Sequence, residues 1–212
     1  GAATGKFSCD FKGELPAPSY AVFPASLVSS AGAGISDCTF TWPTEQKYGD
    51  PSISKVPMWA ECHGLGDLNG PYSFQSIGGI LHVSVTGTGS INKMRIISDK
   101  PLSGMFRMDE SGNIKFDEGS KSVYYNIDLE ARGNINLSDK ATDFFFSVPA
   151  GYYSGFTVDF FGDAESCYSY EVKGLVEIAK GKVTDITADG IKAAVKEILD
   201  QQNFYELVML PE

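Results

Sequence analysis

Histidine is scarce in this sequence, and long apolar segments are absent. Only two histidines occur among 212 residues, and no run of about 18 apolar residues could span a bilayer as a helix. Basic residues are also few, because 17 Lys and Arg stand against 27 Asp and Glu, a formal net charge of −10. This charge argues against binding to the phosphates of nucleic acids or to an anionic membrane surface. We therefore expect no nucleic-acid partner.

Cysteine is limited to four widely separated residues, Cys9, Cys38, Cys62 and Cys167. No two of them form the C-x-x-C pair of a zinc ribbon or a thioredoxin-type redox centre. Distant cysteines in a β protein are either small buried hydrophobes or members of one or two disulfides. The spacing leaves both alternatives open.

Arrangements that carry catalysis are equally sparse. The chain has no G-x-S-x-G nucleophile elbow. His63, with Glu61 and Asp67 nearby, could supply part of a metal site, but neighbouring residues on a strand point to opposite faces. His82 lies within a strand-like segment, which favours a surface histidine over a catalytic one. We expect a protein that is not an enzyme, with no catalytic residue, cofactor or metal.

Glycine and aromatic residues, in contrast, are plentiful. The chain contains 23 Gly, 14 Phe and 10 Tyr, a composition typical of all-β proteins because aromatic rings pack on pleated faces and glycines turn corners. In Ile80–Val85 every second residue is apolar, which is the period of a half-buried strand. A second apolar run, Ile91–Ile97, follows after Gly87 and Gly89. Because glycine tolerates positive φ, we expect the two runs to pair as an antiparallel hairpin.

The rest of the chain repeats this pattern about every ten residues, as in a β-sandwich or barrel. Phe144–Val148 is an unbroken apolar run closed by Pro149, and we expect an interior strand covered on both faces. Further strands are expected at Ser19–Phe23, Cys38–Trp42, Met58–Cys62, Leu102–Met108, Ile114–Phe116, Val123–Leu129, Tyr152–Phe161, Cys167–Val172 and Leu175–Ile178.

The C-terminal region differs from the rest. Apolar residues at helical spacing predict one α-helix over Ile191–Gln202. After it comes a strand-like apolar segment that would be prone to aggregation if it were uncovered. This segment is our candidate for strand exchange, with Phe204, Tyr205, Leu207, Val208 and Leu210 as its apolar residues.

Two neighbouring tyrosines are the best candidates for ligand contact. Tyr152 and Tyr153 could present their rings to solvent, as carbohydrate-binding modules do, although tyrosines in strands more often pack. We treat both as candidate glycan-contact residues.

Several phrases of the sequence resemble those of fimbrillin-like surface proteins of Gram-negative anaerobes. The similar segments are Tyr20–Pro24 (YAVFP), Trp42–Tyr48 (WPTEQKY), Pro57–Ala60 (PMWA), Tyr72–Gly104 with its GGILHVSVTGTGSINKMRIISDKPLSG, and Phe144–Val158 (FFFSVPAGYYSGFTV). These phrases consist of turns and strands, so they indicate a family without indicating a ligand.

The resemblance implies an exported, cell-surface structural or adhesion protein built of antiparallel β-sandwiches with transthyretin-like topology. It further implies assembly with other fimbrial or surface subunits by strand exchange, or contact with host or glycan ligands. A glycan-binding outer-surface lipoprotein is the alternative. Any membrane attachment would come from a lipid anchor outside these 212 residues. We expect an N-terminal β segment (1–71) that could belong to a first sandwich, a core sandwich (72–186) and a C-terminal helix with its terminal segment (187–212).

Overall fold

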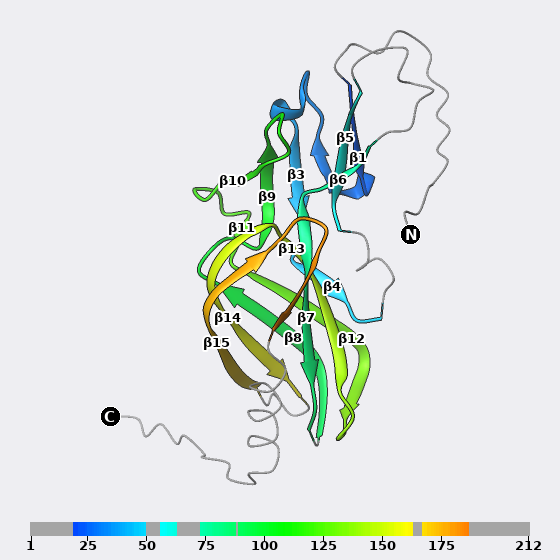
Figure 1. The fold of residues 1–212 in the computed structure, drawn as a ribbon, viewed down its shortest axis with the longest axis vertical. Coiled ribbons are helices and arrows are strands. Elements are labelled where there is room, and N and C mark those ends of the chain that lie inside the picture. Colours follow the sequence, from blue (N-terminus) through cyan, green and yellow to red (C-terminus); the bar gives the residue numbers. More distant parts are fainter. Residues whose placement is uncertain (1–18, 50–55, 63–72, 88, 163–166, 187–212) are drawn as a thin grey trace.

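The computed structural model describes residues 19–49, 56–62, 73–87, 89–162 and 167–186. In these ranges sixteen strands form four sheets, and the only helical elements are the 3-10 turns η1 (Ala25–Leu27) and η2 (Ile35–Asp37) (Figure 1). The expectation of an all-β fold is therefore confirmed. No helix in the described residues is long and apolar enough to cross a bilayer. The expected helix Ile191–Gln202 and the segment Phe204–Leu210 lie outside the described residues.

Two of the sheets form a sandwich in the lower half of Figure 1. The main sheet has the order β15 (Cys167–Ile178), β14 (Gly151–Phe161), β8 (Gly89–Ser98), β12 (Asn126–Leu137) and β4 (Glu45–Lys47). The cover sheet has the order β13 (Thr142–Pro149), β7 (Gly78–Val85) and β16 (Val183–Ile186). Their pairings are antiparallel except for β12 with β4 and β16 with β7, which are parallel.

The other two sheets lie in the upper half of Figure 1. One has the order β10 (Ile114–Phe116), β9 (Ser103–Met108), β3 (Thr39–Trp42) and β2 (Val28–Ser30), with β11 (Val123–Tyr124) also paired to β9. The other has the order β1 (Ser19–Phe23), β5 (Met58–Cys62) and β6 (Gln75–Ser76). Because β3 pairs with β9 and β4 with β12, strands from the first 71 residues share sheets with later strands.

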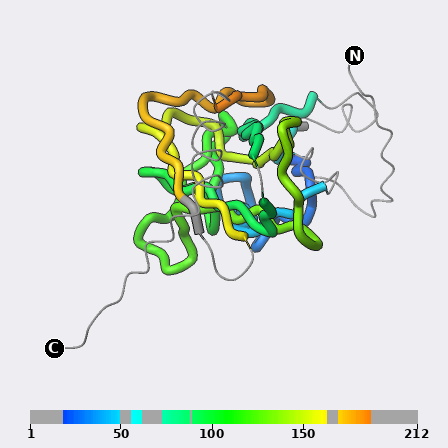
Figure 2. Tube along the Cα trace, turned by 90° about the horizontal axis from the view of Figure 1, so that it is seen from below, coloured from blue at the N-terminus to red at the C-terminus, as the bar shows by residue number. Residues whose placement is uncertain are grey.

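A single hydrophobic core fills the space between these sheets. On β14 the predicted face of Phe156, Val158 and Phe160 is buried, as expected from the two-residue period. Leu81 and Val83 of β7 bury the inner face of the cover sheet in the same way. Viewed along the long axis, β15 and β16 (orange) follow one edge of the molecule (Figure 2).

The expected hairpin around Gly87 and Gly89 is wrong. β7 pairs with β13 and β16, whereas β8 pairs with β12 and β14. The chain therefore crosses from the cover sheet to the main sheet at this point. Val85 at the end of β7 and Ile91 at the start of β8 both belong to the common core. The alternation of apolar residues shows which face of a strand is buried. Two strands alternate in the same way whether they pair as a hairpin or face each other from opposite sheets, so the sequence pattern cannot distinguish the two arrangements.

The expectation of an interior strand covered on both faces at Phe144–Val148 is also wrong. β13 is an end strand of the cover sheet. Its inward residues Phe144 and Phe146 are buried, but Phe145 is 39% exposed and stacks on His82. The apolar run is unbroken because Phe145, on the outer face of β13, covers the ring of His82. Among the described residues, no second layer covers this outer face.

Candidate contact surface

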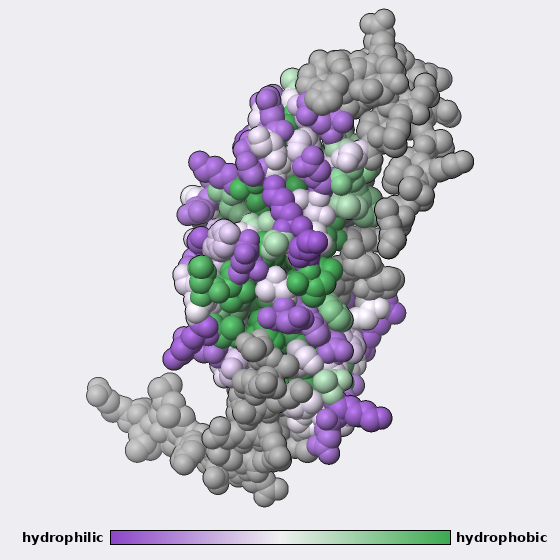
Figure 3. Space-filling view, viewed as in Figure 1, coloured by the Kyte–Doolittle hydropathy of each residue, from purple (hydrophilic) through white to green (hydrophobic). Residues whose placement is uncertain are grey.

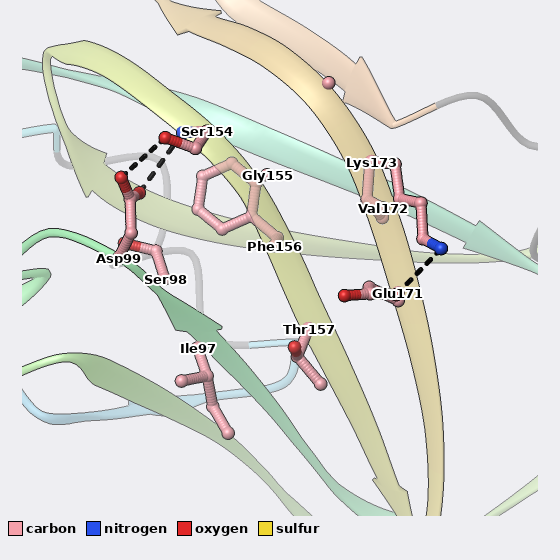
Figure 4. A pocket seen from close by; sticks show the side chains of 11 residues that line it. Ile97, Ser98, Asp99, Ser154, Gly155, Phe156, Thr157, Glu171, Val172 and Lys173 are labelled. Atoms are coloured by element: carbon pink, nitrogen blue, oxygen red, sulfur yellow. Dashed lines mark hydrogen bonds and ion pairs between the residues drawn. The ribbon is translucent and has the colours of Figure 1, made fainter.

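A depression of about 390 Å³ lies on the outer face of the main sheet, where β8, β14 and β15 run side by side (Figure 4). One wall is the turn after β8, where Asp99 accepts hydrogen bonds from Ser154. The Ser154 backbone N–H lies 3.1 Å from Oδ1 and its hydroxyl 2.7 Å from Oδ2. These two bonds lower the pKa of Asp99. The opposite wall carries Glu171 and Lys173 of β15, which form an ion pair at 3.3 Å.

A bulge gives the depression its shape. Gly174 and Leu175 of β15 lie opposite the single residue Ser154, between the pairs Tyr153–Val176 and Gly155–Lys173. Gly174 has φ +103°, a backbone conformation that favours glycine, and a Cβ there would meet no atom within 4 Å. The extra residue projects Leu175 into solvent, where it is 75% exposed.

The two candidate glycan-contact tyrosines lie on opposite faces of β14. Tyr152 is 54% exposed, and its hydroxyl donates to Oε1 of Glu177 at 3.0 Å. Tyr153 is 3% exposed, packs on Phe156 with ring centroids 5.0 Å apart and donates to the carbonyl of Pro149 at 2.8 Å. Burial raises the pKa of Tyr153. The expectation that Tyr153 presents its ring to solvent is therefore wrong, because successive strand residues alternate between faces.

At the β13 edge of the cover sheet, a side chain occupies the place of a neighbouring strand. The Ser147 backbone N–H donates to Oε1 of Gln46 at 2.9 Å, and Nε2 of Gln46 donates to the Ser147 carbonyl at 2.8 Å. The indole N–H of Trp42 donates to the same carbonyl at 3.1 Å. Gln46 is buried and supplies one donor and one acceptor, as a paired strand residue would. This edge is therefore closed to a partner strand at Ser147.

The outer edge of β15 differs from the β13 edge. β15 is the end strand of the main sheet. Within the described residues, a side chain bonds to its backbone near the end of the strand, where Thr184 Oγ1 donates to the Glu177 carbonyl at 2.9 Å. Figure 3 shows hydrophobic residues (green) among hydrophilic ones (purple) in the lower half of the view, where the main sheet lies. Leu175 of β15 and Val183 of the neighbouring β16 are both exposed. An edge strand with exposed apolar side chains is a surface that another chain can pair with.

The histidine that lies in the described residues is on the outer face of the cover sheet. His82, expected as a surface histidine, lies between Asp143 and Asp185, whose positions 61 and 103 residues away gave no signal in the sequence. His63 and Asp67 lie outside the described residues. In the part of the chain that the structure describes, no three His, Cys, Asp or Glu side chains are arranged to hold a metal ion.

Of the four cysteines, Cys38 has a free thiol that donates to the carbonyl of Gly34 at 3.3 Å. Cys9 and the side chains of Cys62 and Cys167 lie outside the described part of the chain, so their pairing stays open. The strand-exchange residues Phe204, Tyr205, Leu207, Val208 and Leu210 also lie outside it.

No protein-family model and no curated protein matches the chain. Among solved structures, the crystal structure of a candidate cell adhesion protein from Bacteroides uniformis is similar, with a TM-score of 0.43 and 12% identity. The match covers 81% of this chain and 67% of that one. Similarity at this level does not transfer a function.

Proposed function

We propose that this protein is a cell-surface structural or adhesion protein of fimbrillin type, which works by contact with partner chains and not by catalysis. The observation that supports this most directly is the contrast between the two sheet edges. Gln46 closes the β13 edge at Ser147, whereas β15 carries an exposed leucine beside an edge that the described residues leave largely unpaired. The fimbrillin-like phrases of the sequence agree with such a role.

The contact would be β-strand addition. An extended segment pairs with the β15 edge through backbone hydrogen bonds, and its alternate side chains fill adjacent hollows. The bulge at Gly174 and Leu175 interrupts the register, so pairing is expected before it, along Ser169–Lys173. The segment Phe204–Leu210 is the candidate donor or closing strand.

Removal of residues 204–212 tests the donor. Sedimentation velocity should show a changed assembly state, and thermal unfolding should shift. Unchanged assembly and unchanged thermal stability would remove this segment from the mechanism.

A Leu175→Glu variant tests the edge separately. Added charge at the exposed leucine should weaken assembly or partner binding without unfolding the protein. Val28→Glu, at a partly exposed valine of a different sheet, is the matched control. Equal effects of the two variants would mean that the β15 edge has no special role.

The alternative is a glycan-binding surface protein, and Tyr152 favours it. Its ring is exposed, its hydroxyl is fixed by Glu177, and it lies two residues from Ser154 in the wall of the depression. Aromatic faces can stack on sugar rings while carboxylates such as Asp99 accept bonds from sugar hydroxyls. Glycan-array binding should be lost in Tyr152→Ala and kept in Tyr124→Ala, which removes a comparably exposed ring from β11. Absence of binding by the unmodified protein would dispose of this alternative.

A further inference from the structure

The ring of His82 is held between two carboxylates on the outer face of the cover sheet. Its Nδ1 atom lies 2.6 Å from Oδ1 of Asp185 on β16, and its Nε2 atom lies 3.0 Å from Oδ1 of Asp143 on β13. Phe145, directly opposite on β13, stacks on the imidazole with centroids 4.7 Å apart and planes inclined by 12°. Side chains from all three strands of the sheet therefore meet at this histidine.

These contacts favour one charge state of the ring. A neutral imidazole has a single N–H and would turn a lone pair toward one carboxylate, whereas the imidazolium donates from both nitrogens. Among the described residues, Asp143 and Asp185 have His82 as their ion-pair partner, and Ser84 adds a hydrogen bond to Asp143. Burial lowers the pKa of His82, but the hydrogen bonds to Asp185 and Asp143 outweigh burial and raise it above 6.5.

We propose that His82 is a proton-operated latch that holds β16 onto the cover sheet. β16 is an end strand of only four residues that pairs in parallel with β7. Near its start the Ile80 N–H donates to the Lys182 carbonyl at 2.8 Å, and buried Ile186 anchors its end. The protonated ring adds charge-assisted links on both sides of β7. When the ring loses its proton, two carboxylates flank an uncharged group and one of them loses its donor, so β16 is held more weakly.

The direction of the pH effect follows from the raised pKa of His82. The latch is fully closed below pH 6.5, the ordinary pKa of a histidine side chain. It opens as the pH rises through the higher pKa that His82 has in the folded protein. Each unit by which the pKa of His82 in the closed state exceeds its pKa in the state with β16 detached, where Asp143 remains beside the ring, is expected to increase the opening constant of β16 by about tenfold across the titration. The latch operates independently of which partner the protein contacts.

Two measurements on the full chain test this proposal. An NMR titration gives the pKa of His82, and hydrogen exchange, corrected for intrinsic rates, gives the protection of β16 and β8 amides between about pH 5.5 and about pH 8. We expect a pKa above 6.5 and a loss of protection at Val183–Ile186 across that titration, with β8 unchanged. In His82→Gln, which keeps a donor but has no charge, β16 should show the lower protection at every pH.

A second variant keeps the test decisive if His82→Gln does not fold. Asp185→Asn changes a side chain that is mostly exposed and should lower the pKa of His82 and reduce the pH-dependent change in β16. The resonance of His82 is recognised because it persists in His63→Gln. The proposal is overturned by a His82 pKa at or below 6.5, by a protection change that persists in His82→Gln, or by an unaltered His82 pKa in Asp185→Asn.

Discussion

Arg95 binds both carboxylate oxygens of Asp128 on the outer face of the main sheet. Nε of Arg95 lies 2.6 Å from Oδ1 and Nη2 lies 2.9 Å from Oδ2. Nζ of Lys93 adds a third contact, 2.6 Å from Oδ2. Lys93 and Arg95 also lie over the ring of Phe161, 5.4 and 5.6 Å from its centroid. Side chains from the three adjacent strands β12, β8 and β14 therefore form one cluster, in which two cations of β8 lie between the Asp128 carboxylate and the Phe161 ring.

This network should make stability depend on pH in the acid range. Burial raises the pKa of Asp128, but the bonds from Arg95 and Lys93 outweigh it and lower the pKa below 3.8. The stabilisation is fully present above 3.8 and is lost as the pH falls through the folded-state pKa of Asp128. Urea midpoints measured from about pH 6 down to about pH 2 should fall more steeply for the wild type than for Asp128→Asn. If the urea midpoints of the two proteins fell equally steeply with decreasing pH, this prediction would be contradicted.

The cap on the β13 edge gives a second prediction. Gln46→Leu leaves the buried Ser147 backbone N–H without its acceptor, and the expected loss is about 1 to 3 kcal/mol in the free energy of unfolding. Ser147→Ala is the matched control, because the Ser147 hydroxyl is buried with no hydrogen-bond partner while the backbone bonds remain. Its stability should stay within about 0.5 kcal/mol of the wild type in urea unfolding. If the two variants lose equal stability, Gln46 does not act as a cap.

The position of most strands followed from the sequence, but their partners did not. The two-residue period located β7, β8 and β14 because it records which side chains face the core. It could not show that β7 and β8 belong to different sheets, since pairing depends on the whole topology. For the same reason Leu175 was expected at the start of a separate strand, although it lies in a bulge within β15.

The candidate contact surface was predictable only in part. The same alternation that located β14 puts Tyr152 and Tyr153 on opposite faces, so the sequence contained the information that only one of them is exposed. The partners of His82 lie 61 and 103 residues away in the chain, and the partner of Gln46 lies 101 residues away. No local pattern reports such contacts.

Gly104 should tolerate no side chain. Its φ of +100° favours glycine, and a Cβ would collide with the carbonyl oxygen of Ser122 where β9 pairs with β11. Gly104→Ala is expected to cost about 3 kcal/mol or more. Gly133→Ala is the control, because a Cβ at Gly133 meets no atom within 4 Å, and it should be neutral or stabilise by up to about 1 kcal/mol. Thermal unfolding followed by circular dichroism compares them, and similar melting temperatures would refute the predicted collision.

Tyr152 and Tyr153 should separate binding from stability. Tyr153→Ala removes a buried ring that packs on Phe156 and bonds to Pro149, so a loss of about 3 to 5 kcal/mol is expected. Tyr153→Phe keeps the ring and should lose about 1 kcal/mol, the contribution of the hydrogen bond. Tyr152→Ala, at an exposed ring, should stay within about 0.5 kcal/mol of the wild type.

Urea unfolding and glycan binding should therefore be measured on the same samples of these three variants. A binding defect in Tyr153→Ala would report unfolding, whereas a defect in a fully folded Tyr152→Ala would report lost contact. If Tyr152→Ala were the destabilised variant and Tyr153→Ala were as stable as the wild type, the inward and outward faces of β14 would have to be exchanged. Such an exchange would also place Phe156, Val158 and Phe160 in solvent, which their burial in the common core makes energetically costly.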